Sequence, residues 1–516
     1  MRTGEARPGG GGKAGFGRPD LRALAGSALL WSWVDALYMS SFFAPFGQRG
    51  LMPELATWST FLMVVPISVV LLRRGLARRL VSTPRALAVA GALGSAASLL
   101  FALAAALGSA GLVVACAVPA AAFMASSVLA WGVVYCEAGA RSALVYVAGG
   151  FACALAPDLT FMFMAPPVGA IAPATLPLAS NLLLTTQDLP AKLAAMERGV
   201  AEAAGMASAG ARAHAAGSAR GVIGGLVRRN LGISFGTVAS MALIMFGLGY
   251  MQHQISFTTM LGAGGVTMDV VRCASSALLL LIALRGESRA RYAYSVGLLA
   301  IVAGFSLMPF LHATGWFWVC GAVNIAGYAT FDVLIWVIVA QAAYTGLSDP
   351  LRLICVMRLL VSSAFTAMGG FLSMGLALLQ MTGPFTYADA VFMGYLMTVA
   401  IVLILANRDV WDLLAARRPQ PGDSGAQGGR SSLESAVDLL AGCWGLTGRE
   451  REVFALLALG RTQPWVAERL GISESTVNSH VRHIYAKAQV NGRQELLDLV
   501  AEAQSPESID IADQRR

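Results

Sequence analysis

The sequence predicts an all-α protein: a twelve-helix integral membrane bundle, arranged as six plus six, followed by a small C-terminal domain of four helices. Of its 516 residues, 56% are hydrophobic and only 13% are charged, whereas soluble domains have about 25% charged residues. Charge is concentrated near the end, because residues 444–503 hold seven basic and seven acidic side chains. These observations separate a part that faces lipid from a part that faces water.

The membrane part is predicted from apolar stretches of sufficient length, since a helix needs about 20 apolar residues to cross the hydrocarbon core. In the first half such stretches cover residues 21–44, 55–72, 86–107, 112–135, 143–164 and 166–184. In the second half they cover residues 231–251, 257–284, 292–311, 316–343, 353–379 and 387–406. We therefore expect six transmembrane helices in 21–184, a central loop at 185–229 and six more helices in 230–406. Small residues such as those at 91–95 should let these helices approach closely.

Arginines give an independent indication of the same topology, because positive residues accumulate in cytoplasmic loops. The loops on one side carry only Arg49. The alternate loops carry Arg73, Arg74, Arg78, Arg79 and Arg85, then Arg141, then Arg198, Arg212, Arg220, Arg228 and Arg229, then Arg285, Arg289 and Arg291, then Arg352. This pattern predicts a multi-pass protein of the cell inner membrane with both termini cytoplasmic, including an N-terminal tail at 1–20. The first apolar run is too long for a cleaved signal peptide.

The six-plus-six layout, with an arginine-rich second loop in each half, resembles the major facilitator superfamily over residues 21–406. The family has a Gly-x-x-x-Asp-Arg-x-Gly-Arg pattern in the loop after its second helix. Here residues 73–79 read Arg-Arg-Gly-Leu-Ala-Arg-Arg, which keeps the basic residues and lacks the acidic one. The resemblance implies the fold of a transporter for the membrane part.

Charged residues inside apolar stretches are costly in lipid and usually face a cavity. Six of them are therefore candidates for a ligand or ion pathway: Asp35, Asp158, Asp269, Arg272, Asp332 and Arg358. Asp269 and Arg272 share a helix face, so they either neutralise each other or take part in binding. Arg358 alternatively lies near the cytoplasmic end of its helix. Large aromatic residues in or beside these stretches should pack in the bundle or form a belt at the membrane interface, rather than build a ligand cage. These residues are Trp131, Trp316, Trp318 and Trp336.

Metal, cofactor and enzymatic chemistry are not predicted. Six of the seven cysteines lie inside apolar stretches without the paired spacing of a disulfide framework or a zinc site. His480 and His483 are three residues apart, but no third ligand is near them in the sequence. There is no phosphate-binding loop and no nucleophile triad. We therefore expect a protein that is not an enzyme and holds no metal or cofactor.

After the last apolar stretch, residues 407–441 have the Pro, Gly and Ser content of a flexible cytoplasmic linker. Ser431 and Glu434 have capping-box spacing and predict a short helix that ends near Gly442. Thr447 and Glu450 repeat this spacing, which predicts a second helix that Gly460 ends.

The remaining helices of the domain at 442–506 follow from turn and capping residues. Pro464 suits the first turn of a helix that begins after Thr462. Residues 471–473, Gly-Ile-Ser, form a tight turn, and Ser473 caps a helix over 474–488. Its buried stripe is Val477, Val481 and Ile484, and its opposite face carries Asn478, Ser479, Arg482 and Lys487. A short helix, a tight turn and a polar-faced helix are what a reader of the DNA major groove needs.

The domain has a characteristic set of residues: Leu446, Thr447, Arg449, Glu450, Glu452, Val453, Val466, Ala467, Leu470, Ile472, Ser473, Thr476, Val477, His480 and Arg493. With these residues it resembles the LuxR-type helix-turn-helix domain of bacterial transcription regulators. The resemblance implies that Asn478, Ser479 and Arg482 face bases of double-stranded DNA, that Thr476, His480 and Lys487 contact phosphates, and that the helix 493–502 forms a homodimer. The family commonly has Lys where this sequence has Asn478, and Asn can bond adenine in two places.

The domain has no net charge, so its attraction to phosphate should be weak and a dimer or a tether should be needed to concentrate it on DNA. Our leading hypothesis is a membrane-embedded transcription regulator whose bundle senses an unknown small-molecule ligand or the state of the lipid bilayer. RNA polymerase is a further candidate partner. The alternative is a secondary transporter with a regulatory DNA-binding tail, and a third hypothesis makes the bundle a mere anchor.

Overall fold

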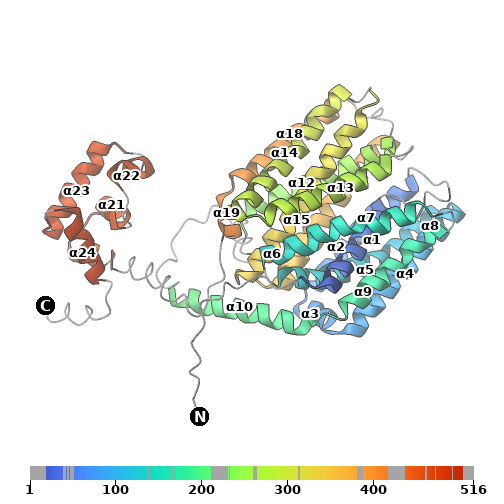
Figure 1. Ribbon diagram of the computed structural model, residues 1–516, viewed down its shortest axis with the longest axis horizontal. Helices are drawn as coiled ribbons and strands as arrows, with labels where there is room; N and C mark the ends of the chain where they lie inside the picture. Colours follow the sequence, from blue (N-terminus) through green and yellow to red (C-terminus); the bar gives the residue numbers. More distant parts are fainter. Residues whose placement is uncertain are drawn as a thin grey trace, which may run out of the picture. The chain divides into compact units, whose positions relative to one another are not determined.

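The computed structural model describes most of the chain, and Figure 1 shows its helices in chain order. The described residues are 19–38, 42–43, 46, 51–137, 139–164, 168–210, 231, 233–259, 264–311, 314–379, 387–415, 436–437, 439–458, 462–470, 472–490 and 492–503. Over these residues the chain is helical and forms no strand. It divides into two compact units, Met1–Arg418 and Pro419–Arg516. The predicted all-α class is confirmed.

Each of the twelve predicted apolar stretches contains a helix or a run of consecutive helices. The first half comprises α1 (Leu21–Tyr38), α2 (Leu51–Leu71), α3 (Arg74–Ser82), α4 (Pro84–Leu107), α5 (Ala110–Cys136), α6 (Ala140–Ala143), the π-helical turn η2 (Leu144–Ala148), α7 (Gly149–Met162), α8 (Val168–Ile171), η3 (Ala172–Thr175) and α9 (Leu176–Leu184). The second half comprises α10 (Leu189–Gly210), α12 (Phe235–Thr259), α13 (Gly264–Ala283), α14 (Glu287–Leu311), α15 (Phe317–Tyr344), α16 (Pro350–Leu353), the π-helical turn η4 (Ile354–Val361), α17 (Ser362–Leu378), α18 (Tyr387–Ala406) and α19 (Arg408–Ala415).

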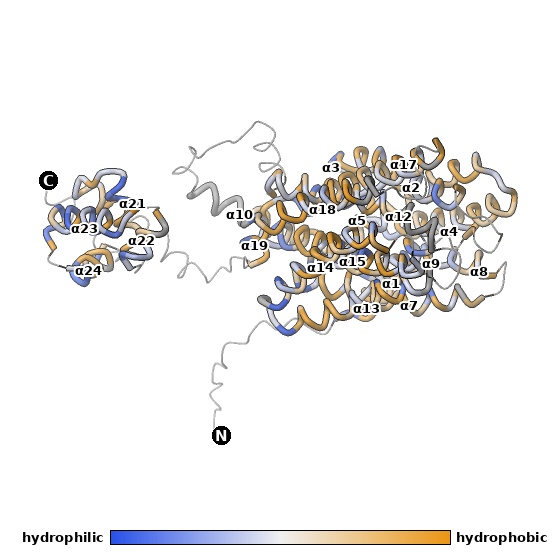
Figure 2. Tube along the Cα trace, turned by 90° about the horizontal axis from the view of Figure 1, so that it is seen from above, coloured by the Kyte–Doolittle hydropathy of each residue, from blue (hydrophilic) through white to orange (hydrophobic). Residues whose placement is uncertain are grey.

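Length and apolar character support a multi-pass membrane protein. Within the described residues, seven helices are long and apolar enough to cross a bilayer, and two bent pairs of helices raise the number to nine. The helices α1 and α13, each of which carries two charged residues, are not among them. Figure 2 shows apolar residues along the helices of the bundle, while hydrophilic residues are more frequent in the C-terminal unit.

Among the described helices of the membrane unit, some lie outside the predicted crossings. The helix α3 lies in the arginine-rich second loop, α10 occupies part of the predicted central loop 185–229, and α19 lies in the predicted linker 407–441. In α19, Val410 and Trp411 are buried against the bundle, and the guanidinium of Arg291 lies 4.8 Å from the ring centre of Trp411. Hydropathy missed α19 because charged residues alternate with its apolar ones.

Small residues allow close helix crossings, as the glycine content predicted. A Cβ atom added at Gly94 in α4 would lie 2.4 Å from Cγ of Phe123 in α5. One added at Gly249 in α12 would lie 1.9 Å from the carbonyl oxygen of Thr366 in α17. Neither position has room for a side chain, so glycine at these points sets the distance between neighbouring helices.

The C-terminal unit has its own hydrophobic core, which α21 (Gly448–Ala458), α22 (Gln463–Leu470), α23 (Glu474–Ala488) and α24 (Arg493–Ala503) share. The predicted bounds of α23 are confirmed at both ends, and α22 begins directly after Thr462 as expected. Residues 439–443 are helical as well. Ser431, Glu434, Gly460 and Gly471, to which the sequence assigned caps and turns, lie outside the described residues.

Candidate functional site

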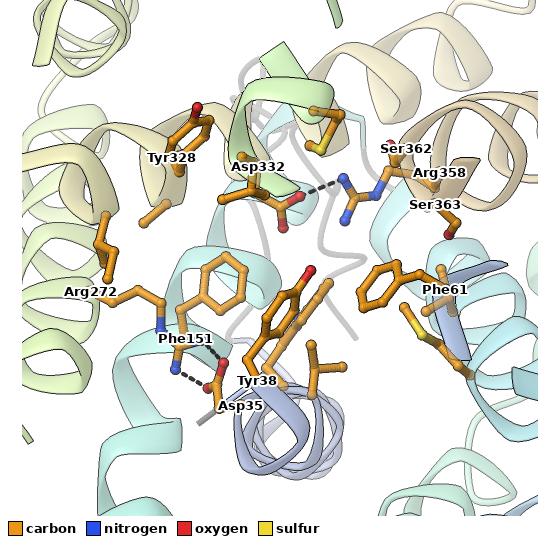
Figure 3. Close-up of a pocket in the computed structure, with 18 of the residues that line it drawn as sticks. Asp35, Tyr38, Phe61, Phe151, Arg272, Tyr328, Asp332, Arg358, Ser362 and Ser363 are labelled. Carbon is orange, nitrogen blue, oxygen red and sulfur yellow. Dashed lines mark hydrogen bonds and ion pairs between the residues drawn. The ribbon is translucent and has the colours of Figure 1, made fainter. Parts of the chain in front are cut away.

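The membrane unit contains a cavity of about 140 Å³ between its two halves. Its wall comes from α1, α2, α5 and α7 on one side and from α12, α13, α15, η4 and α17 on the other. Most of the wall is apolar or aromatic, and Figure 3 shows Tyr38, Phe61 and Phe151 around the open space. Two groups of charged side chains interrupt this apolar wall.

The first charged group joins α15 to η4. Nη1 of Arg358 donates to Oδ1 of Asp332 over 2.5 Å, and the guanidinium lies 4.8 Å from the ring centre of Trp336. Arg358 is buried and lines the cavity, and its place near the cytoplasmic end of its helix stays a prediction. In Figure 3 the hydroxyl of Tyr38 points toward this ion pair.

The second charged group joins the two halves of the bundle. Nη1 and Nη2 of Arg272, on α13, donate to the two carboxylate oxygens of Asp35, on α1. Asp158, on α7, lies behind this pair: its Oδ2 is 3.7 Å from Nη2 of Arg272, and its Oδ1 accepts a hydrogen bond from Ser32. A bidentate pair of this kind fixes the relative position of α1 and α13.

The hypothesis that Asp269 and Arg272 neutralise each other is wrong. The guanidinium of Arg272 contacts Asp35 instead, and Oδ1 of Asp269 has no hydrogen-bond partner among the described residues. A long arginine side chain reaches across a helix interface, where a bidentate carboxylate fits its two terminal nitrogens better than a neighbour on its own helix.

Where α6 begins and α15 ends, the two halves are also in direct contact. The backbone N–H of Ala140 donates to Oε1 of Gln341 over 3.0 Å. The rings of Tyr135 and Trp336 meet edge to face with centroids 4.9 Å apart. Because Trp336 also lies against Arg358, this contact connects the wall of the cavity to the joint between the halves.

Of the six charged candidates, the structure brings Asp35, Arg272, Asp332 and Arg358 to the cavity wall, whereas Asp158 lies behind Arg272. Asp269 does not line the cavity. Sequence reasoning missed the aromatic residues of the wall, which are Trp31, Tyr38, Phe61, Phe151 and Tyr328. Their only sequence signal is an aromatic residue in an apolar stretch, which packing explains equally well. Of the four tryptophans singled out above, Trp131 and Trp336 are buried, while Trp316 and Trp318 are exposed and stacked.

The candidate nucleic-acid interface is the exposed face of α23. Oγ of Ser473 caps the helix by accepting from the backbone N–H of Thr476 over 3.2 Å, and Val477, Val481 and Ile484 are buried in the core of the domain. The polar residues that the sequence assigned to DNA are therefore displayed on the other side. Thr476, Asn478, Ser479 and Arg482 are exposed, and His480 is half-buried.

The opposite end of α23 is fixed to the start of α21. The predicted capping box is present: Oε2 of Glu450 accepts from the backbone N–H of Thr447 over 2.8 Å, and Oγ1 of Thr447 accepts from the N–H of Glu450 over 3.4 Å. Nζ of Lys487 donates to the same Glu450 oxygen over 2.7 Å and to the carbonyl of Gly445 over 3.1 Å. These hydrogen bonds, the one from Lys487 foremost, lower the pKa of Glu450 from 4.5 to about 2.

Lys487 thus has partners inside the domain that the sequence did not indicate. Its contact with a DNA phosphate stays a prediction, and it requires the ammonium group to share its charge between Glu450 and the phosphate. In α24, Leu496 and Val500 lie in the core of the domain itself, and Leu497 is only partly buried. The homodimer predicted for this helix would therefore rely on Leu497, on Leu499, which is also partly buried, and on its polar residues.

Comparison with known proteins places the C-terminal domain among DNA-binding domains. Residues 445–500 match the family described as bacterial regulatory proteins, luxR family. A putative HTH-type transcriptional regulator in the exeN 3'region of Aeromonas salmonicida is 39% identical over 85 residues, which are 16% of this chain and 43% of that protein. The nitrate/nitrite response regulator protein NarL of Escherichia coli strain K12 is 44% identical over 50 residues, which are 10% of this chain and 23% of that protein.

The chain thus spans less than half the length of these relatives, and the match concerns the DNA-binding domain alone. The membrane unit is similar in fold to the major facilitator superfamily proton:xylose symporter XylE, bound in that structure to 6-bromo-6-deoxy-D-glucose. The TM-score is 0.51 at 11% identity, over 75% of this chain and 94% of that one. The protein therefore combines a membrane bundle with the fold of that transporter and a LuxR-type helix-turn-helix domain.

Proposed function

We propose that the protein is a membrane-embedded transcription regulator whose bundle senses a small molecule and whose C-terminal domain binds promoter DNA. The observation that carries this proposal is the presence, in one chain, of a capped helix with an exposed polar face and of a bundle with an internal cavity. In this proposal the bundle lies in the cell inner membrane and both termini are cytoplasmic, as the distribution of arginines favours.

The tether compensates for the charge balance of the domain. With equal numbers of basic and acidic residues, residues 444–503 gain little from phosphate attraction. A chain that holds the domain near a second binding site raises its effective concentration without any new contact. Dimer formation through α24 would act in the same direction, and RNA polymerase is the partner through which a bound domain would affect transcription.

A signal can reach the tether through α15. This helix carries Asp332 in the cavity wall and Gln341 in the joint with α6, and it packs against α19, from which the chain continues toward the C-terminal unit. A ligand shifts the equilibrium between two arrangements of the bundle only if it binds one of them more tightly. A ligand that contacts Asp332 and Arg358 would bind the two arrangements with different affinities. The reason is that α15 and η4, which carry these residues, pack against helices of the first half.

The proposal predicts that transcription from target promoters depends on the exposed face of α23. In a reporter strain, the variants Arg482→Ala and Asn478→Ala should each change expression toward the level of a strain without the protein, because each removes a base contact worth about 1–3 kcal/mol. Arg451→Ala changes an exposed arginine of α21 and serves as the matched control. Unchanged expression in both α23 variants, with normal protein amounts in the membrane, would contradict the proposal.

A secondary transporter with a regulatory tail is the second candidate, because the fold and the cavity between the halves suit alternating access. In that case uptake of a labelled solute should survive deletion of residues 422–516 and should be lost in Asp332→Asn. The basic loop at 73–79, which lacks the acidic residue of the superfamily pattern, favours the regulator.

A further inference from the structure

Part of the hydrogen-bonding capacity of the cavity wall is unused. Arg358 gives Nη1 to Asp332, but no described residue accepts a hydrogen bond from its Nε, and Oγ of Ser363 has no partner there either. Arg358 is 9% exposed and Ser363 is 1% exposed. Leaving a buried donor without an acceptor destabilises the protein, and more so when the donor is charged. Both residues line the cavity, so an occupant that brings an acceptor within reach of these donors would remove this cost.

The unpaired donors belong to a cavity wall that also contains aromatic rings. Figure 3 shows the guanidinium of Arg358 above the space between Tyr38 and Phe61, with Asp332 bonded on its other side. Across the cavity, the ring of Phe151 lies 5.4 Å from the guanidinium carbon of Arg272. A molecule bound in this space would therefore contact aromatic rings along its length and hydrogen-bond donors at one end.

The volume limits the size of the occupant. A dry apolar cavity of about 150 Å³ in another protein accommodates benzene, and the cavity here has about 140 Å³. One ring with a small substituent fits this space. The aromatic wall residues favour a planar ring, because offset and edge-to-face contacts stabilise aromatic pairs beyond the area that they bury.

The charges of the wall select against an ion. Arg358 is neutralised by Asp332, and Arg272 is neutralised by Asp35 with Asp158 behind it. A carboxylate ligand would have to displace Asp332, and an ammonium ligand would have to displace Arg358. Each would leave an uncompensated charge in an apolar surrounding, which costs several kcal/mol. A neutral oxygen accepts from the unused donors and leaves both ion pairs in place.

We propose that the cavity binds a small uncharged aromatic molecule that carries a carbonyl or hydroxyl oxygen, with the oxygen accepting from Arg358 and Ser363 and the ring lying among Tyr38, Phe61 and Phe151. This inference rests on the proposed function, in which the occupant of the cavity is the signal. It adds the chemical class of that signal and the residues that recognise it.

Four probes that share one ring test the chemical class: acetophenone, toluene, benzoate and benzylamine. Each is added to the purified full-length protein in lipid nanodiscs, and the concentration dependence of the Tm gives the affinity. Acetophenone should bind about tenfold or more tighter than toluene, since a hydrogen bond to a charged donor is worth about 1.5–3 kcal/mol. Benzoate and benzylamine should bind more weakly than acetophenone.

Two variants test the residues. Ser363→Ala and Arg358→Lys should each reduce the advantage of acetophenone over toluene, and Arg358→Lys keeps the charge that pairs with Asp332. Ser68→Ala is the matched control, because Ser68 is buried in α2 and donates to the carbonyl of Val64 over 2.6 Å outside the cavity.

The inference is overturned if toluene, benzoate or benzylamine equals acetophenone, if none of the four probes raises the Tm, or if the advantage of acetophenone persists in both cavity variants. These outcomes are separate from failure of the proposed function, because the binding assay contains no DNA. A reporter that is insensitive to Arg482→Ala would remove the proposed function and leave the measured ligand preference standing.

Discussion

Replacing Arg272 by Ala should destabilise the membrane unit by about 3–5 kcal/mol, the cost typical of breaking a buried ion pair by removing one partner. The variant leaves the carboxylate of Asp35 without its bidentate partner and Asp158 without its nearest positive charge. Because the pair joins α1 to α13, its loss also loosens the two halves. Thermal unfolding of the full-length protein in detergent measures the effect as a fall in Tm.

The matched control is Arg285→Ala, which removes an exposed arginine just beyond the end of α13 and should leave the Tm nearly unchanged. The double variant Arg272→Gln with Asp35→Asn removes both charges at once and should recover part of the loss, since no unpaired carboxylate of Asp35 remains. A Tm of Arg272→Ala equal to that of Arg285→Ala would mean that the ion pair does not hold the halves together.

Replacing Glu450 by Gln should destabilise the C-terminal domain by about 1.5–3 kcal/mol, because the hydrogen bond from Lys487 loses its charged acceptor. A Gln side chain can still accept from the backbone N–H of Thr447, so the capping box remains. Folding stability of the isolated unit Pro419–Arg516, which has a core of its own, measures this loss by urea unfolding.

The same interaction makes the stability of the domain depend on pH. The pKa of Glu450 is about 2 in the folded domain, below its ordinary value of 4.5. The folded state therefore binds this proton more weakly than the unfolded state, and the stabilisation is complete above about pH 5 and is lost as the pH falls toward 2. Glu450→Gln should lack this part of the pH dependence. Glu452→Gln, on the same helix and 55% exposed, is the control, and a pH profile of Glu450→Gln that follows the unsubstituted domain would contradict the assignment.

The helix-turn-helix domain could be predicted closely because its ends are encoded locally. The Ser473 cap fixes the start of α23, and the spacing of Val477, Val481 and Ile484 fixes its buried face. Thr447 and Glu450 likewise encode their reciprocal hydrogen bonds within one turn. Lys487 escaped this reasoning because its partner Glu450 lies 37 positions away on another helix.

In the membrane unit, sequence identified the charged candidates but not their partners. An Asp or Arg in an apolar stretch is conspicuous because lipid penalises it. The partner, however, is set by which helices pack together: Asp35 and Arg272 are 237 positions apart, while Asp269, three positions away, proved the wrong choice. The helix α10 was missed for another reason, since its polar residues interrupt the long apolar run that marks a crossing.

The most direct test of the central claim is chromatin mapping of the intact protein by crosslinking in cells, with its location in the membrane fraction verified in parallel. If the DNA-binding domain is tethered to the membrane, we expect enrichment at a discrete set of promoter fragments. Arg482→Ala should remove this enrichment while the amount of protein in the membrane stays the same. An identical distribution for the intact protein and for Arg482→Ala would contradict the claim that this chain reads DNA from the membrane.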